Sequence, residues 1–361
     1  MKPEKPAPVL AITPNEQIFL PKCYHRIQDI CAVIYDQLTE IYKEKNYQDL
    51  YHTESILDGS ETGMDELNKN KIHAIDWLTW NNKNKDLELI LTKHIILSIT
   101  SDFINFVFES LYCAKRGKIT VAYALIRKPF TDELLILEQL LYNRSDFIYR
   151  FFHSDTVETY DPSSKNINKV DVIKNAVDCL TNPLFDADFV HDLRYNKLCE
   201  YGINGISNHA LHIVTKDKNY RTEPQNFNFV FSQEEDFALY YKQYYWVVPY
   251  ILIYAVDIID KLIFSILKDT DNQNLSIVKR LRRTIGFSLF TESYLRTKKD
   301  SIFILFNKKI RFTCPICKNK YFLKRDDYEF FFETEAILCP KCNNDNLTIE
   351  NIQKIKNIIG L

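Results

Sequence analysis

Apolar residues recur at helical spacing along most of the chain, and this pattern predicts a mainly α protein. In the stretch of about 22–45, the apolar positions from Ile27 to Ile41 fall on one face. Similar patterns predict helices at about 86–113, 119–144, 167–180, 186–200 and 233–268. Pro129 must kink or restart one of these helices, because proline has no amide hydrogen to donate. We therefore expect a multi-helix bundle as the body of the protein.

The helix expected at about 233–268 is the most apolar of the set. Its stretch from Tyr244 to Val256 has no charge, but these thirteen residues are fewer than the roughly 20 that a membrane span requires. A stripe of polar side chains also runs along it: Tyr250, Tyr254, Asp257, Lys261, Ser265 and Lys268. We interpret it as the central core helix of the body, with membrane insertion as the alternative.

Near the C-terminus the helical pattern gives way to two pairs of cysteines. Cys314-Pro315-Ile316-Cys317 and Cys339-Pro340-Lys341-Cys342 each place two residues between their cysteines. Two such pairs can bring four thiolates to the corners of a tetrahedron around Zn²⁺, which accepts four sulfurs. A closed four-sulfur site is structural, because no coordination position is left for water or substrate. The alternatives are iron in the same site and reduced cysteines that only pack in a core.

The sequence around these cysteines resembles a rubredoxin-like zinc ribbon over about 312–346. In such ribbons the residue after each pair is often glycine, whereas this chain has Lys318 and Asn343. The aromatic runs Tyr321-Phe322-Leu323 and Tyr328–Phe332 have strand-type composition, and we expect them to form a small antiparallel sheet. A closing helix is expected from about Thr348 to Ile359, which completes a small C-terminal β zinc ribbon.

The segment 279–311 is strongly basic. It holds ten basic and two acidic residues, a net charge of +8, whereas the whole chain carries −2. The cations that we assign to contact with RNA or DNA are Lys279, Arg280, Arg282, Arg283, Lys308, Lys309 and Arg311. This interpretation follows from the affinity of clustered cations for phosphate backbones. The alternative is a solvated helix face whose charge acidic neighbours balance in the fold.

These patterns divide the chain into four parts. They are an extended N-terminal arm at 1–21, a helical body at 22–278, the basic segment at 279–311, and the zinc ribbon with its closing helix at 312–361.

Composition narrows the class of protein further. The 361 residues are 46% hydrophobic and 26% charged, as in ordinary soluble proteins. Seven glycines and the absence of G-x-G-x-x-G or P-loop patterns disfavour a glycine-rich cofactor loop. The five cysteines outside the ribbon are scattered, and the N-terminus has no apolar signal region. We expect a cytoplasmic protein, with a homo-oligomer or protein partner suggested by the abundant aromatic and aliphatic residues.

Two polar places interrupt the apolar body. Arg127–Glu133 combines cations and carboxylates beside the proline break, which is either a polar site inside the body or a surface turn with local ion pairs. His209 and His212 lie three residues apart, on one face if the segment is helical. Imidazole is the natural acid–base group near neutral pH, and the alternative is a histidine bonded within a helix seam.

The helical pair containing Ala122-Tyr123-Ala124-Leu125-Ile126-Arg127 and Leu134-Leu135-Ile136-Leu137-Glu138 carries a second resemblance. Over about 90–215 the chain resembles the all-helical HEPN-like proteins of abortive infection and phage defence. Many of those families are metal-independent RNases with Arg and His four to six residues apart on one helix. Asn204 occupies that spacing here, so an arginine would have to come from another helix.

The sequence thus supports three functional hypotheses. The first is a nucleic-acid-associated helical protein with a structural zinc ribbon, acting in phage defence. The second is an RNA-cleaving enzyme in which His209 and His212 act as acid and base while Arg127 stabilises the transition-state charge. The third is a structural protein in which the ribbon clasps the tail and the helices form an oligomer interface.

Overall fold

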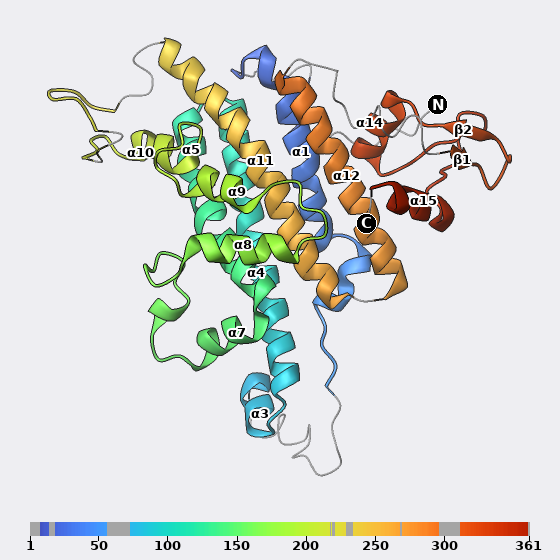
Figure 1. Cartoon of the computed structure of the whole chain (residues 1–361), viewed down its shortest axis with the longest axis horizontal. Coiled ribbons are helices and arrows are strands. Elements are labelled where there is room, and N and C mark those ends of the chain that lie inside the picture. Colours follow the sequence, from blue (N-terminus) through green and yellow to red (C-terminus); the bar gives the residue numbers. More distant parts are fainter. Residues whose placement is uncertain are drawn as a thin grey trace.

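The computed structural model describes residues 8–13, 19–55, 73–216, 218, 221–228, 234–267, 269–295 and 311–359. Within these residues the protein is mainly helical, and the only sheet has two antiparallel strands near the C-terminus (Figure 1). The predicted fold class is therefore confirmed.

Three long helices form the centre of the body. The helices α1 (His25–Thr39), α11 (Glu234–Ile266) and α12 (Thr270–Leu295) pack against one another side by side (Figure 1). Almost every α11 side chain between Tyr244 and Ile263 is buried, so α11 is the core helix that its apolar pattern predicts. Among the described residues, no helix combines the length and the apolar character that a membrane span requires.

A second pair of helices covers another side of α11. The helix α3 (Ala74–Trp80) leads into α4 (Asn84–Lys115), and α5 (Ile119–Lys128) packs along α4. Gly117 joins the pair at a φ of 80°, a left-handed backbone conformation that glycine adopts without the steric cost of a Cβ atom. The predicted helical pair and its break at Gly117 are confirmed.

Pro129 does not end the helical segment that begins with α5 but changes its hydrogen-bonding pattern. The residues Pro129–Glu133 form a π-helical turn between α5 and α6 (Leu134–Tyr142). A wider turn fits here because proline cannot donate the amide hydrogen bond of a regular helix. The predicted kink therefore takes the form of a local bulge.

Shorter helices complete the body. They are α7 (Arg144–His153), α8 (Lys169–Cys179), α9 (Ala187–Arg194) and α10 (Ile203–Leu211). Short 3-10 helices occur at Lys22–Tyr24, Glu40–Tyr42, Lys45–Leu50 and Val157–Thr159. The helices expected at about 167–180 and 186–200 correspond to α8 and α9, with α9 ending earlier than expected.

The C-terminal module packs on α12, on the side away from the α4–α5 pair (Figure 1). It consists of β1 (Arg311–Thr313), β2 (Lys320–Phe322), α14 (Arg325–Thr334) and α15 (Ile349–Ile359). Phe332 of α14 lies directly over Gly286 of α12, where a Cβ atom would approach the Phe332 ring to 2.6 Å. A glycine at this position therefore lets α14 sit close against α12. The boundary expected at 278/279 falls inside α12.

The aromatic run at Tyr328–Phe332 is helical, so the prediction of a second ribbon strand there is wrong. Tyr328, Phe331 and Phe332 are buried and recur at helical spacing, which places them on one face of α14. Asp327 caps the helix by accepting a hydrogen bond from the Lys324 amide at 2.9 Å. The strand that pairs with 320–322 is instead β1, with Phe312 opposite Tyr321.

Candidate metal centre and buried charge sites

The two cysteine pairs form turns of the same local geometry. In the first turn the Lys318 amide donates to the Cys314 carbonyl at 3.0 Å, and in the second the Asn343 amide donates to the Cys339 carbonyl at 2.9 Å. Lys318 and Asn343 have φ values of 58° and 56°. Both positions that often hold glycine in such ribbons therefore adopt the left-handed conformation that favours it.

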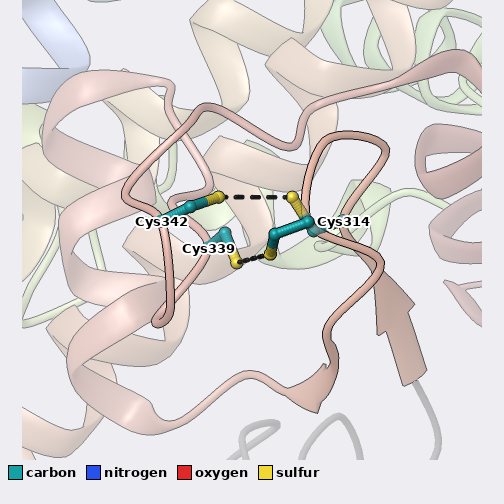
Figure 2. Close-up of side chains that lie close together, drawn as sticks. Cys314, Cys339 and Cys342 are labelled. Atoms are coloured by element: carbon teal, nitrogen blue, oxygen red, sulfur yellow. Dashed lines mark hydrogen bonds between the residues drawn. The ribbon is translucent and has the colours of Figure 1, made fainter.

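The four sulfur atoms converge. Sγ of Cys314 lies 3.5 Å from Sγ of Cys342, and Sγ of Cys317 lies 3.6 Å from Sγ of Cys339 (Figure 2). All four sulfurs lie within 4.8 Å of one another. A tetrahedral ion with metal–sulfur bonds of about 2.3 Å places neighbouring sulfurs about 3.8 Å apart. The four cysteines are thus arranged to hold a metal ion, as the sequence predicts.

At Cys314 and Cys339 the surrounding backbone lowers the pKa and so favours the thiolate form, which is the form that binds a metal. The backbone amide of Cys317 points at the Cys314 sulfur and lowers its pKa. Burial acts to raise the pKa of Cys339, but the amides of Lys341 and Cys342 outweigh it and lower that pKa to about 6. Since four sulfurs fill a tetrahedral shell, this centre is suited to a structural rather than a catalytic role.

Three of the seven cations predicted to contact nucleic acid lie inside the protein, namely Lys279, Arg282 and Arg283. Lys279 and Arg282 of α12 are 1% and 2% exposed. The Lys279 ammonium pairs with the carboxylates of Glu40 and Glu335, the latter at 3.0 Å. The Arg282 guanidinium contacts the same two carboxylates at 3.2 and 2.8 Å. We call these four residues the charge clamp, because it joins α12, the end of α1 and the end of α14.

Arg283 is also buried, and it pairs with Asp257 at 2.9 Å and with Asp260, both on α11. In this fold Lys279, Arg282 and Arg283 are therefore not placed to contact a phosphate backbone. The alternative interpretation of this segment was a solvated helix face whose charge acidic neighbours balance. Acidic neighbours do balance the charge of these three cations, but they do so in the interior of the protein.

The remaining predicted cations have different surroundings. Arg280 is half-buried and donates to the Asn182 carbonyl at 3.0 Å. Arg311 is exposed at the start of β1. Lys308 and Lys309 lie outside the described residues.

The charge clamp should be sensitive to loss of one carboxylate. Replacing Glu335 with Gln leaves Lys279 and Arg282 with an uncompensated buried charge, so we expect Glu335→Gln to weaken docking of the C-terminal module by about 2–4 kcal/mol. Faster hydrogen exchange in the peptide 325–335 would report this loss. Glu333→Gln is the matched control, since Glu333 forms only a partly exposed pair with Arg26 and should change docking by less than about 1 kcal/mol.

The clamp also predicts an acid-dependent release of the module. Burial alone would raise the pKa of Glu40, but the cations of Arg282 and Lys279 outweigh it and lower the pKa below the ordinary 4.5. A lowered pKa contributes stability that is complete above pH 4.5 and is lost as the pH falls through the folded-state value. The protection of 325–335 from hydrogen exchange, expressed relative to the intrinsic rate at each pH, should therefore fall below pH 4.5, and protection that stays constant across this range would contradict the clamp.

The body contains a buried polar site that the sequence reasoning missed. Arg194 of α9 is fully buried; it donates to the Phe130 carbonyl at 2.7 Å and to Glu138 at 2.5 Å. The Tyr254 hydroxyl donates to the same Glu138 oxygen at 2.7 Å. The π-helical turn frees carbonyls from regular helix bonding, and Arg194 binds one of them. The signal in the sequence is a lone arginine in α9 and a lone glutamate in the apolar α6.

The polar stretch Arg127–Glu133 is partly buried and partly exposed. Lys128 pairs with Asp102 of α4 and, at 3.1 Å, with Glu133. Glu133 is buried, whereas Lys128 and Asp102 are about half exposed, with side-chain exposures of 48% and 46%. Burial raises the pKa of Glu133 to about 8. The stretch is therefore partly a polar site inside the body, where the Glu133 carboxyl lies, and partly a surface turn with local ion pairs, where Lys128 lies.

The predicted catalytic residues are only loosely related in space. The helix α10, which carries His209, packs against α5, which carries Arg127. His212 is exposed just beyond the end of α10, and the His209 side chain lies outside the described residues. In the part of the chain that the structure describes, no hydrogen bond or ion pair joins Arg127 to His212. The four-sulfur cluster is therefore the better-defined site.

Comparison with known proteins gives no relative from which to transfer a function. No protein-family model, no curated protein and no solved structure matches this chain. These comparisons give no support to the HEPN-like resemblance of the body. A function can therefore be inferred only from the geometry of the sites.

Proposed function

We propose that the cysteine cluster binds Zn²⁺ as a structural ion, and that the ribbon built around it holds single-stranded nucleic acid. The zinc assignment rests on four sulfur ligands at tetrahedral spacing. The nucleic-acid assignment rests on the exposed face of the ribbon sheet.

One face of this sheet combines an aromatic ring with cations. In the pairing of β1 with β2, Arg311 lies opposite Phe322 and Thr313 lies opposite Lys320. Phe312 alternates with these residues and is buried, so Arg311, Lys320 and Phe322 share the outer face. Phe322 is 51% exposed there. A large aromatic side chain left in water between two cations is the observation that carries the proposal.

Charge is segregated within the C-terminal module. Three acids of α14 and its C-terminal end pair with cations of the body: Glu329 and Glu333 pair with Arg26, and Glu335 joins the charge clamp. Four lysines outside the helices of the module are exposed, namely Lys318, Lys320, Lys324 and Lys341. The stretch 311–324, which contains both strands, therefore presents only positive charge, although the acids and bases of the whole module are nearly balanced.

Single strands fit this face better than a duplex. A base can stack on an exposed aromatic ring while neighbouring cations contact the phosphates, and this mode tolerates any sequence. Two strands of three residues form a small platform for one or two bases. A role in phage defence is also part of the proposed function. It rests only on the resemblance of residues 90–215 to HEPN-like proteins.

Binding can be measured by fluorescence anisotropy with labelled single-stranded RNA and DNA of about 20 nucleotides. Phe322→Ala should weaken binding by about 1–3 kcal/mol, the usual contribution of one stacked base. Arg311→Gln should lower the slope of log K against log salt by about 0.7, because one fewer counterion is released. Lys174→Gln, which removes an exposed cation on α8, is the matched control. Absence of binding, or equal losses in the control, would refute the proposal.

RNA cleavage is a second candidate function, favoured by the packing of α10 against α5. In this hypothesis His209 and His212 act as acid and base and Arg127 stabilises the developing phosphate charge. Total RNA incubated with the protein should then be cut, and both His209→Ala and Arg127→Ala should abolish cutting. An unchanged RNA pattern with the wild-type protein would eliminate the enzyme.

A further inference from the structure

Half of the polar stripe on α11 lines a cavity. Asp257, Lys261 and Ser265 of this stripe border a cavity of about 310 Å³ between α11 and α12. The other polar or charged side chains that line it are Asp260 of α11, Thr181 after α8, and Gln273, Ser276, Arg280 and Arg283 of α12. The cavity therefore runs along the seam of a helix pair.

A seam of this composition is costly for stability. Neighbouring helices normally bury apolar side chains against each other, as α11 does along its other faces. Here five charged side chains and several hydroxyl and amide groups occupy the interface. Burying polar groups costs free energy unless each finds a partner. Such departures from ordinary packing are expected at functional sites.

The charges in the cavity are not all compensated. Arg283 pairs with Asp257 and Asp260 at one end. Lys261 and Arg280, by contrast, form no ion pair within the described parts of the chain, and Arg280 donates only to the Asn182 carbonyl. Burial lowers the pKa of Arg280, as expected for a cation that has lost water without gaining a close anion. The cavity as a whole carries one more positive than negative charge.

We propose that this cavity binds a small molecule through a phosphate monoester, which pairs with Arg280 and Lys261. A guanidinium and an ammonium together offer several charged donors, which suits the three terminal oxygens of a phosphate. The hydroxyl of Ser276 and the carboxylate of Asp257 can bind hydroxyl groups elsewhere on the same ligand. The volume is at the lower end of the range for ligand sites and suits a sugar phosphate or a mononucleotide. This proposal is independent of the ribbon and its nucleic-acid face.

Binding should be tested on the full chain by isothermal titration with four probes. Ribose 5-phosphate and adenosine monophosphate represent the two sources of the phosphate monoester, inorganic phosphate tests the anion alone, and succinate tests a carboxylate. We expect at least one phosphate monoester to bind with one site per chain. Lys261→Met and Arg280→Gln should each weaken that binding at least tenfold, because each removes a charged donor.

Two further variants separate this cavity from other cationic surfaces. Lys242→Met removes an exposed cation from the same helix and should leave binding unchanged, whereas Ser276→Leu should block binding by filling the cavity. Melting temperatures without ligand show whether each variant is folded. Lys261 is only partly buried, so Lys261→Met is the variant least expected to disturb the fold. The proposal fails if no phosphate monoester binds, if succinate binds equally well, or if Lys242→Met weakens binding as much as Lys261→Met.

Discussion

Removing the metal ion is expected to unfold the C-terminal module while the helical body stays folded. Without the ion, the bonds that would hold four cysteines within 4.8 Å of one another are lost, and a module of this size depends on such a link to stay folded. Structural zinc contributes on the order of 10 kcal/mol to small domains of this kind. A chelator should abolish hydrogen-exchange protection in 311–347 and leave most of the helical circular dichroism intact.

Substitution of one ligand should have the same effect. Cys339→Ser is expected to lose the ion, which elemental analysis would show as a fall from one zinc per chain to none. Cys23→Ser is the matched control, since Cys23 is an exposed cysteine remote in sequence from the cluster. Visible absorption would distinguish iron from zinc, because a zinc–thiolate centre is colourless. Full protection of 311–347 in metal-free protein would contradict a structural ion.

Loss of Arg194 is expected to destabilise the body by about 3–5 kcal/mol. Arg194→Met leaves the Glu138 carboxylate buried without its cation and the Phe130 carbonyl at the π-helical turn without its donor. Urea denaturation followed by circular dichroism would measure the change in the free energy of unfolding. Arg221→Met, at an exposed arginine, should change it by less than about 0.5 kcal/mol.

A second substitution tests the physical cause of that loss. If the uncompensated charge on Glu138 is responsible, Glu138→Met combined with Arg194→Met should recover part of the stability, because removing both members of a buried pair costs less than removing one. Arg194→Lys should not restore it, since an ammonium lacks the planar fork that reaches Phe130 and Glu138 together. Additive losses in the double variant would show that packing, rather than charge, determines the effect.

Features that depend on short-range rules could be predicted from the sequence. Two C-P-x-C pairs predicted the sulfur cluster because the spacing within each turn fixes two sulfurs at once. Helical spacing of apolar residues predicted the central helix α11 and the α4–α5 pair. Pro129 predicted an irregular helix, since its missing amide acts locally whatever surrounds it.

Local composition was misleading where a helix and a strand use similar residues. The aromatic run Tyr328–Phe332 has strand-type composition, yet it folds as α14. Its buried Phe332 lies over Gly286 of α12, and this contact forms only once the module has docked. Tertiary packing therefore overrode the local preference, as it does most easily in short aromatic segments.

The roles of the charged residues depend on contacts that form only in the folded protein. Lys279 and Arg282 look like a phosphate-binding surface in the sequence, but they are buried against Glu40 and Glu335, which lie far away along the chain. Arg194 and Glu138 likewise find each other across 56 residues. Helical periodicity shows which side chains share a face, because it depends on neighbours three or four residues away. It contains no information about which distant charge will lie opposite, and that pairing determines whether a cation binds a ligand or holds the fold together.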